Sequence, residues 1–335
     1  MRHARTVAAF VAAATLAGCS ALSSGDQSRS GGSSDGGASR LSIVVPADPG
    51  GGWDQTGRAI QAVLEGEKLV PGATVTNVGG AGGTVGLANI ATSSDPNLLL
   101  VMGLVMVGAV ETNQSQARIE DTTPIARLTE EQEVIAVPID SPYETIGDLV
   151  EAVRTHGKEV TITGGSAGGT DHILAALLLK AAGVAPDAIG DTLNYVAYSG
   201  GGESLAALLG HNVDAGVSGV SEYAEQVKAG TLRALAVSGA EREALLPDVP
   251  TLSESGYDVE LTNWRGVVAP GSIDDAQRER LVALVTDLTK SDAWVQTLEE
   301  RGWSDAFLAG DAFDTYLQGN IAEIKGVLHD IGLVG

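Results

Sequence analysis

The sequence predicts an α/β fold. Segments with strand-like and helix-like hydrophobic patterns alternate along the chain, which is typical of helices packed on a mostly parallel sheet. Four glycine clusters each stand just before a helical pattern. The chain has 335 residues, of which 44% are hydrophobic and 19% charged, so it is long enough for two domains that each bury a core.

The N-terminal segment predicts export and a lipid anchor. Residues 1–18 begin with basic residues and continue with an apolar stretch that is too short to span a bilayer, as in a signal peptide. The Leu-Ala-Gly sequence before Cys19 resembles the lipobox of bacterial lipoproteins, with a plain signal peptide as the alternative. Residues 19–40 are rich in Ser and Gly and are expected to form a flexible tether. We therefore expect an extracytoplasmic protein, lipid-anchored through Cys19 to the outer face of the cell membrane.

A strand, a glycine turn and a helix open the body of the chain. Leu41–Pro46 is an apolar strand, Pro49–Asp54 contains three consecutive glycines, and residues 55–64 carry apolar side chains on one helical face. Glycines leave main-chain N–H groups uncovered, and the helix dipole points the same way, so this turn is a predicted anion site. Asp54 is expected to cap the first turn of the helix.

The same arrangement recurs three times. The second unit has its strand at 74–78, its turn at 79–84 and its helix at 85–91. In the third unit these are 160–163, 164–171 and 172–180. In the fourth they are 195–198, 199–203 and 204–209. Ligands of open α/β sheets bind outside the carboxyl ends of the strands. Several such turns facing one cleft would therefore bind a small multivalent anion.

The remaining segments complete the predicted order. Residues 98–110 are interpreted as a buried strand and its loop. Thr145 and Asp148 form a capping-box variant that opens a helix to Arg154. The other predicted strands are 125–128, 133–138, 213–217, 232–237 and one within 259–268, and the other helices are 222–229, 272–289 (capped by Ser272), 293–301 and 311–328.

Two crossings of the chain predict two discontinuous domains. The strand at 133–138 is expected to lead into the second domain, and the strand at 232–237 to lead back. The first domain would then comprise 41–137 with 238–335, and the second 138–237. Glycine turns lie at strand ends in both, so the ligand would bind in a cleft that closes by hinge motion.

The net charge restricts the partners. With 43 acidic and 20 basic residues, the formal charge of −23 argues against nucleic-acid binding. An anionic ligand would need backbone amides or a local cation. Five scattered histidines and a single cysteine provide no metal-ligand spacing, and neither a dinucleotide nor a P-loop motif occurs, so no metal or cofactor is expected.

One segment matches an enzyme motif. Residues 164–168 fit the Gly-x-Ser-x-Gly nucleophile elbow, with Ser166 as the nucleophile of a serine hydrolase. The triad would need a later histidine, but His172 is too close in sequence, and His211 and His329 have no supporting context. Because glycine is frequent here, we expect a chance match and keep the hydrolase as a minor alternative.

Several side chains have two interpretations. Trp53 would line the cleft or pack on the neighbouring helix. His172 would face the ligand as a cation or donor, or would be a surface or helix-capping histidine. Arg265 would reach the cleft or pair with a surface acid. Ser218 stands at the end of the strand at 213–217 and is a further candidate.

Four segments match one set of motifs, in order and over nearly the whole mature chain. They are Val45–Asp54 with Arg58, Val78–Gly86, Tyr195–Gly202 and Trp264–Pro270. They resemble the motifs P-x-x-P-G-G-x-x-D-x-x-x-R, N-x-P-G-A-G-G-x-x-G, Y-x-G-G and W-x-G-x-x-A-P of the substrate-binding receptors of tripartite tricarboxylate transporters, also called Bug-type receptors.

The resemblance implies a two-domain, type II periplasmic-binding-protein fold, or Venus flytrap. Such a receptor has no enzymatic activity. It binds a small di- or tricarboxylate, such as citrate, between its domains and delivers it to integral membrane permease subunits. In the family, two first-domain loops hold one carboxylate through backbone amides and ordered waters. The matching positions here are Gly51, Gly52, Asp54, Gly82, Gly83 and Thr84. In the second domain, the residues implied to hold the rest of the ligand are Ser166, Gly168, Gly169, Thr170, Gly201 and Gly202, with Arg265 or His172 as charge partners.

The sequence departs from the family pattern at three places. Asp48 stands where an aromatic or apolar residue is common, Trp53 replaces a small residue, and Gly79 or Gly80 replaces a proline. Trp53 would narrow the pocket. A ligand-presenting sensor for a two-component system, built on the same fold, is the second interpretation that the sequence leaves open.

Overall fold

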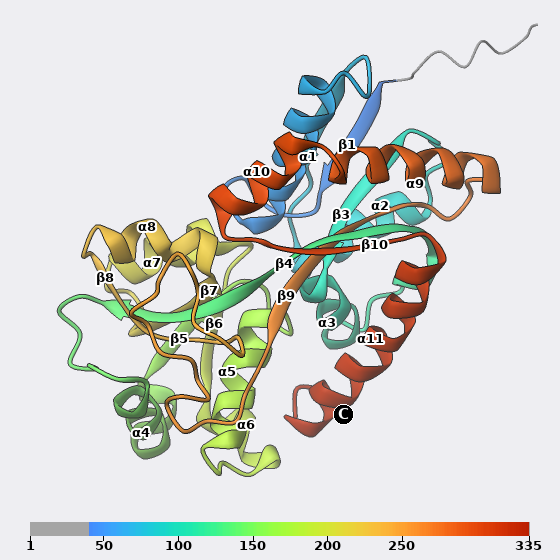
Figure 1. Ribbon diagram of the computed structural model, residues 1–335. Coiled ribbons are helices and arrows are strands. Elements are labelled where there is room, and N and C mark those ends of the chain that lie inside the picture. The colour runs from blue at the N-terminus through green and yellow to red at the C-terminus, as the bar shows by residue number, and fades with distance from the viewer. Residues whose placement is uncertain (1–39, 335) are drawn as a thin grey trace, which may run out of the picture. The chain divides into compact units, whose positions relative to one another are not determined.

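A computed structural model describes residues 40–334 of the protein (Figure 1). The predicted signal peptide, Cys19 and all of the tether except Arg40 lie outside the described residues. The described part contains a sheet of ten strands with helices packed against it. This confirms the predicted α/β class.

The first sheet section begins with three parallel strands. The strands β1 (Leu41–Val45) and β2 (Ala73–Asn77) are neighbours, and β3 (Leu98–Gly103) lies on the other side of β1. The strand β9 (Thr262–Pro270) is antiparallel to β3 and connects this group to β4. The short β10 (Ser304–Ala309) pairs with the beginning of β4.

The second sheet section contains β5 to β8. The strand β5 (Thr161–Gly164) lies parallel between β6 (Asn194–Ala197) and β7 (Ala215–Gly219). Both β7 and β8 (Leu232–Val237) pair with the end of β4.

One strand joins the two sections. The 17-residue β4 (Thr122–Pro138) pairs with β9 over its first part and with β7 and β8 over its last part, as its long arrow in Figure 1 shows. The sequence predicts two separate strands here, which is wrong. Thr129 and Glu131 between them are buried, so the polar residues that look like a loop in sequence are inside the sheet.

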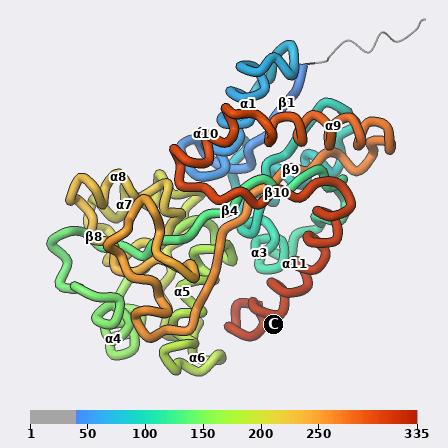
Figure 2. The backbone as a smooth tube through the Cα atoms, viewed as in Figure 1, coloured from blue at the N-terminus to red at the C-terminus, as the bar shows by residue number. Residues whose placement is uncertain are grey.

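The helices cover the sheet and follow the strands. They are α1 (Gly52–Gly66), α2 (Thr84–Ala91), α3 (Leu104–Thr112), α4 (Ile146–His156), α5 (Thr170–Ala181), α6 (Pro186–Thr192), α7 (Gly201–Leu209), α8 (Val220–Lys228), α9 (Asp275–Thr289), α10 (Asp292–Arg301) and α11 (Asp311–Asp330). Figure 2 shows α10, from near the end of the chain, beside α1 near its start, and the two helices are in contact. No single helix within 40–334 has the length and apolarity to cross a membrane, although the bent pair α5 and α6 passes that test together.

Three local predictions need correction. Residues 104–112 form a helix, α3, and not a loop; almost all of its faces are buried, so its apolar run has no helical period to detect. Asp54 is not the N-cap of α1, because Gly51 occupies that position. The long helix α9 is capped by Asp274, whose side chain accepts from the N–H of Gln277, and not by Ser272.

Candidate functional site

A small cavity of about 50 Å³ lies where the ends of the two sheet sections meet. Its lining comes from the turn before α1, from the turn after β5, from the start of α7 and from the ends of β7 and β9. Among the predicted site residues, those that line it are Gly51, Gly52, Trp53, Ser166, Gly201, Ser218 and Arg265. An adjoining hollow of about 360 Å³ shares Ser166 with the cavity.

The N-terminus of α1 meets a carboxylate from the other sheet section. The N–H of Gly52 donates to Oε1 of Glu222 over 2.8 Å. A Cβ at Gly52 would lie 2.2 Å from Nη2 of Arg265, so no larger residue fits without moving the guanidinium. One amide of the glycine turn that the sequence predicts as an anion site therefore already donates to a carboxyl group of the protein itself.

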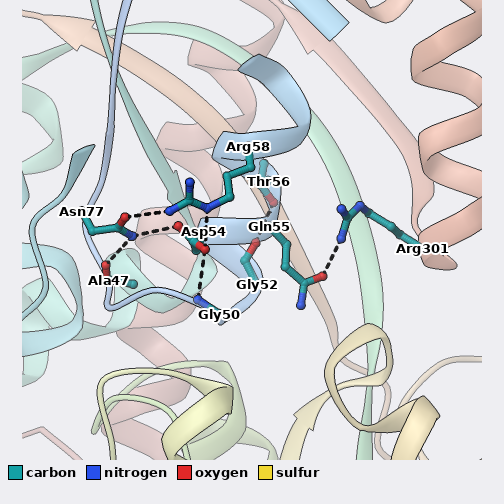
Figure 3. Close-up of polar contacts among 9 residues, drawn as sticks. All are labelled: Ala47, Gly50, Gly52, Asp54, Gln55, Thr56, Arg58, Asn77 and Arg301. Carbon is teal, nitrogen blue, oxygen red and sulfur yellow. Dashed lines mark hydrogen bonds and ion pairs between the residues drawn. The ribbon is translucent and has the colours of Figure 1, made fainter. Parts of the chain in front are cut away.

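Asp54 holds the first glycine turn in place through hydrogen bonds, as Figure 3 shows. Its Oδ2 accepts from the N–H of Gly50 over 3.0 Å and from Nε of Arg58 over 2.9 Å, and its Oδ1 accepts from Nδ2 of Asn77 over 2.9 Å. Burial raises the pKa of the Asp54 carboxyl, but these hydrogen bonds outweigh it and hold the pKa below its ordinary value. The carboxylate therefore stays ionised and positions the turn, and it is not among the cavity-lining groups.

The second loop of the first sheet section lies at the adjoining hollow. Gly82 and Gly83 have φ of 64° and 88°, a region that favours glycine. A Cβ at Gly82 would lie 3.3 Å from Cβ of Ser166, and one at Gly83 would meet the ring of Trp53 at 2.7 Å. Thr84 donates from its hydroxyl to the carbonyl of Ala81 over 2.9 Å. Of these three predicted residues, only Gly82 lines the hollow.

Four predicted residues make contacts that shape the turn after β5 and the start of α5. Nδ1 of His172 accepts from the N–H of Gly168 over 3.1 Å, and the imidazole stacks on Tyr195 with ring centroids 4.2 Å apart. Burial lowers the pKa of His172 to about 4, so the ring is neutral at pH 7 and supplies no charge. Gly169 is the N-cap of α5, and Thr170 donates to Oδ1 of Asn263 over 3.2 Å. None of these four lines the cavity, in contrast to Ser166.

The start of α7 approaches the same carboxylate that α1 holds. A Cβ at Gly201 would lie 1.3 Å from Oε2 of Glu222, whereas a Cβ at Gly202 would meet nothing within 4 Å. The two N-termini, one from each sheet section, therefore converge on the carboxylate of Glu222. Gly202 is exposed and points away from it.

A buried group of charges surrounds this point. Arg265 is 1% exposed and pairs through Nη2 with Oε1 of Glu131, which is also buried. Burial raises the pKa of Glu222 to about 7 and that of Asp171 to about 6. Burial, followed by the charges of Asp171 and Glu131, holds the pKa of Glu133 well above its ordinary value. Asp171 and Glu222 line the cavity together with Arg265.

The acidic residues of this group are not among the site residues predicted from the sequence. Glu131 and Glu133 alternate along β4 and so face the same side of the strand, a signal that the sequence contains. Asp171 follows the third glycine turn, and its Oδ2 accepts from the N–H of Gly165. That Glu222, at the third position of α8, reaches the start of α1 is not visible in the sequence.

The hydrolase alternative finds no support in the geometry. Among residues 40–334, no hydrogen bond joins Ser166 to a histidine, and Nδ1 of His172 is occupied by a main-chain N–H. Within the same residues, no group of three or more His, Cys, Asp or Glu side chains is arranged to hold a metal ion.

Comparisons with known proteins identify the family. The model of the tripartite tricarboxylate transporter family receptor matches residues 58–333. The chain belongs to this family. A protein of Agrobacterium vitis, described as a UPF0065 protein in an intergenic region, is 32% identical over 249 residues, covering 73% of this chain and 69% of its own. BugT of Bordetella pertussis is 25% identical over 302 residues, covering 87% and 89%. These findings confirm the resemblance that the four motifs indicate.

Solved structures confirm the fold of this tripartite transporter receptor. MatC from Rhodopseudomonas palustris, solved with malate, has a TM-score of 0.75 and 23% identity over 86% of this chain and 99% of its own. A second protein of that organism, solved with adipate, has a TM-score of 0.77 and 22% identity over 88% and 97%. The chain thus has the fold of two-domain periplasmic binding proteins. As a family member it is an extracytoplasmic solute-binding receptor.

Proposed function

We propose that this receptor binds a small carboxylate in the cavity between its two sheet sections and delivers it to the membrane subunits of a tripartite transporter. The observation that carries the proposal is the convergence of α1 and α7 on one carboxylate position. Gly52 donates to Glu222 there, and a Cβ on Gly201 would clash with the same carboxyl, so the start of α7 lies close to it. Helix N-termini stabilise anions through free N–H groups and the helix dipole.

The relatives support a carboxylate as the ligand. Two proteins of the same fold were solved with malate and with adipate, both dicarboxylates. Here Arg265 has Nε and Nη1 free of hydrogen bonds among the described residues and lies at the cavity wall, so it supplies a guanidinium for a ligand carboxylate. The small volume of the cavity, narrowed by Trp53, favours a ligand no larger than a short dicarboxylate over citrate.

The two sheet sections support the predicted domains. Among the strands of residues 40–334, only β4 continues through both, and the chain returns to the first section between β8 and β9. We infer that residues 41–137 with 238–335 form one domain and 138–237 the other, and that they close over the ligand. A fall in the radius of gyration on ligand binding, measured by small-angle X-ray scattering, would support this division; an unchanged radius would oppose it.

The experiment that tests the function is titration calorimetry of the purified protein with malate, adipate, succinate and citrate. We expect one-to-one binding of at least one dicarboxylate with a Kd on the order of 1 μM, the free energy of which is about −8 kcal/mol. At a hundredfold excess over Kd, the ligand would stabilise the fold by about 2.7 kcal/mol and raise Tm. Failure of every carboxylate to bind would contradict the proposal.

We also propose that Cys19 carries the lipid that anchors the receptor. Its position after the apolar N-terminal stretch supports this assignment. Expression of the full-length chain in a bacterial host should place the protein in the membrane fraction, and Cys19→Ser should move it to the soluble extracytoplasmic fraction. Equal distribution of both forms would rule the anchor out.

A further inference from the structure

The cavity is more acidic than a site for a fully ionised dicarboxylate should be. Among residues 40–334, Arg265 is the only Lys or Arg at the cavity wall, and the carboxyls of Asp171 and Glu222 lie at the same wall. Behind them, Glu131 pairs with Arg265, and Glu133 lies close to Asp171. Four buried carboxyls thus surround one guanidinium. A ligand that brought only negative charge would meet net repulsion in a region with little water.

Three of these groups have buried polar atoms without partners. Nε and Nη1 of Arg265, a residue that is 1% exposed, have no hydrogen-bond partner among the described residues. Oε2 of Glu222 and both carboxyl oxygens of Glu133 are buried and also unpartnered there. Of the three, Arg265 and Glu222 are the two that line the cavity, so a ligand can reach them. Buried charged groups left in this state are costly, and a ligand that satisfies Arg265 and Glu222 removes that part of the cost. Arg265 needs an acceptor, and Glu222 needs a donor.

The other polar side chains next to the cavity do not supply a positive charge to balance these carboxyls. His172 accepts a hydrogen bond at Nδ1 from Gly168 and stacks on Tyr195, so its ring is committed to the turn. The hydroxyl of Tyr195 donates to the carbonyl of Gly165, and Tyr223 bonds with Ser204. Within residues 40–334, the groups around the cavity therefore leave a positive charge to come from the ligand.

We propose that the ligand is a small carboxylic acid that also carries an ammonium group, as an amino acid does. Its carboxylate binds the free nitrogens of Arg265, and its ammonium group donates to Glu222 and Asp171. This assignment rests on the proposed function, because it places an acid ligand in the same cavity. It makes Glu222 and Asp171 the residues that select the amine-bearing acid over its amine-free analogue.

Glu222 also has a simpler possible role. It accepts from the N–H of Gly52 and so joins the two sheet sections, which would make it a contact of the closed form that competes with any ligand carboxylate. The two roles differ in one measurable respect. A selecting residue changes the ratio of affinities for matched ligands, whereas a competing contact changes both affinities in the same direction.

The test is titration calorimetry of the whole protein with two matched pairs, succinate against aspartate and glutarate against glutamate. In each pair only the α-ammonium group differs. We expect the amine-bearing acid of at least one pair to bind about tenfold or more tightly, a difference of about 1.4 kcal/mol. In Glu222→Gln the affinity of the amine-bearing acid divided by that of its amine-free partner should fall below about threefold, chiefly because the amine-free acid binds better. Asp171→Asn, which keeps an acceptor for the N–H of Gly165, should shift the ratio the same way.

Glu225→Gln is the matched control, since Glu225 lies one turn away on α8 with its side chain exposed. It should leave the ratio unchanged. The proposal is overturned if the amine-free acids bind as tightly as their partners in the unmodified protein. It is equally overturned if Glu222→Gln changes both affinities of a pair by the same factor. If malate and adipate bind but no amino acid does, the receptor function stands and only this assignment fails; if nothing binds, both fail.

Discussion

At the scale of single residues, the site depends on glycines for two different reasons. Gly82 and Gly83 need positive φ, so a side chain there is strained whatever space is available. Gly52 and Gly201 have no such φ, and their lack of a side chain admits Arg265 and Glu222 instead. The second reason is purely tertiary, because the groups that fill the space come from β9 and α8.

Gly201 and Gly202 offer a matched pair of substitutions. In Gly201→Ala the new Cβ would displace the Glu222 carboxylate, which is 1.3 Å from its position, so ligand affinity should change by about tenfold or more, equivalent to about 1.4 kcal/mol. Gly202→Ala meets open space and should stabilise α7 by up to about 1 kcal/mol. Titration calorimetry and urea unfolding of both variants check this, and equal affinities in the two would contradict it.

At the scale of elements, local signals explain some helix ends and not others. The helix α4 begins at the predicted capping box, in which Thr145 accepts from the N–H of Asp148 and Asp148 accepts in return. The helix α1 begins instead at a glycine without a side-chain cap, and the N–H of its first residue, Gly52, donates to Glu222. The start of α4 is thus stabilised by its own cap, whereas the start of α1 is stabilised by a contact with Glu222 at the site.

Thr145→Ala tests the local cap. Loss of the hydroxyl acceptor should lower the free energy of unfolding by about 1 kcal/mol without changing ligand affinity. Thr155→Ala, on the exposed last turn of the same helix, should stay within about 0.5 kcal/mol of the unmodified protein. Urea unfolding measures both, and an equal loss in the two variants would show that the cap contributes nothing specific.

At the scale of the whole molecule, function depends on joining two sheet sections around a charged centre. The buried pair of Arg265 and Glu131 lies at this join, where β9 and β4 run side by side. Raised pKa values of Glu222 and Asp171, caused chiefly by burial, mean that the folded chain holds protons there that the unfolded chain releases. The stability of the whole protein is therefore linked to pH through this centre.

Stability should fall as pH rises from 6.5 to 8. The pKa of Glu222 is about 7 in the folded chain against 4.5 for a free side chain, and that of Asp171 is about 6 against 3.8, so the stability they confer is lost progressively from about pH 4 to about pH 7. The range from pH 6.5 to 8 contains the last part of this loss, about 1 kcal/mol, chiefly from Glu222. The lowered pKa of His172, about 4, acts in the opposite direction and offsets about 0.4 kcal/mol of it, so the net fall expected is about 0.5 kcal/mol.

Urea unfolding at pH 6.5 and pH 8 measures this difference. Glu222→Gln should remove the fall, because an amide does not titrate, and Glu225→Gln on the exposed face of α8 should preserve it. A stability that is flat or rising across this window in the unmodified protein would show that the carboxyls at the cavity are ionised throughout.

The sequence by itself determined the α/β class, the four glycine turns and the family motifs, because alternation of strands and helices, turn residues and short motifs are local properties. Only the tertiary structure decided that α3 is a helix and that β4 is one strand, since burial on all sides removes the periodicity from which local structure is inferred. It also decided what faces the ligand position. Glu131, Glu133, Asp171, Glu222 and Arg265 come from four elements far apart in the chain, and their charges combine only after the sheet sections are assembled.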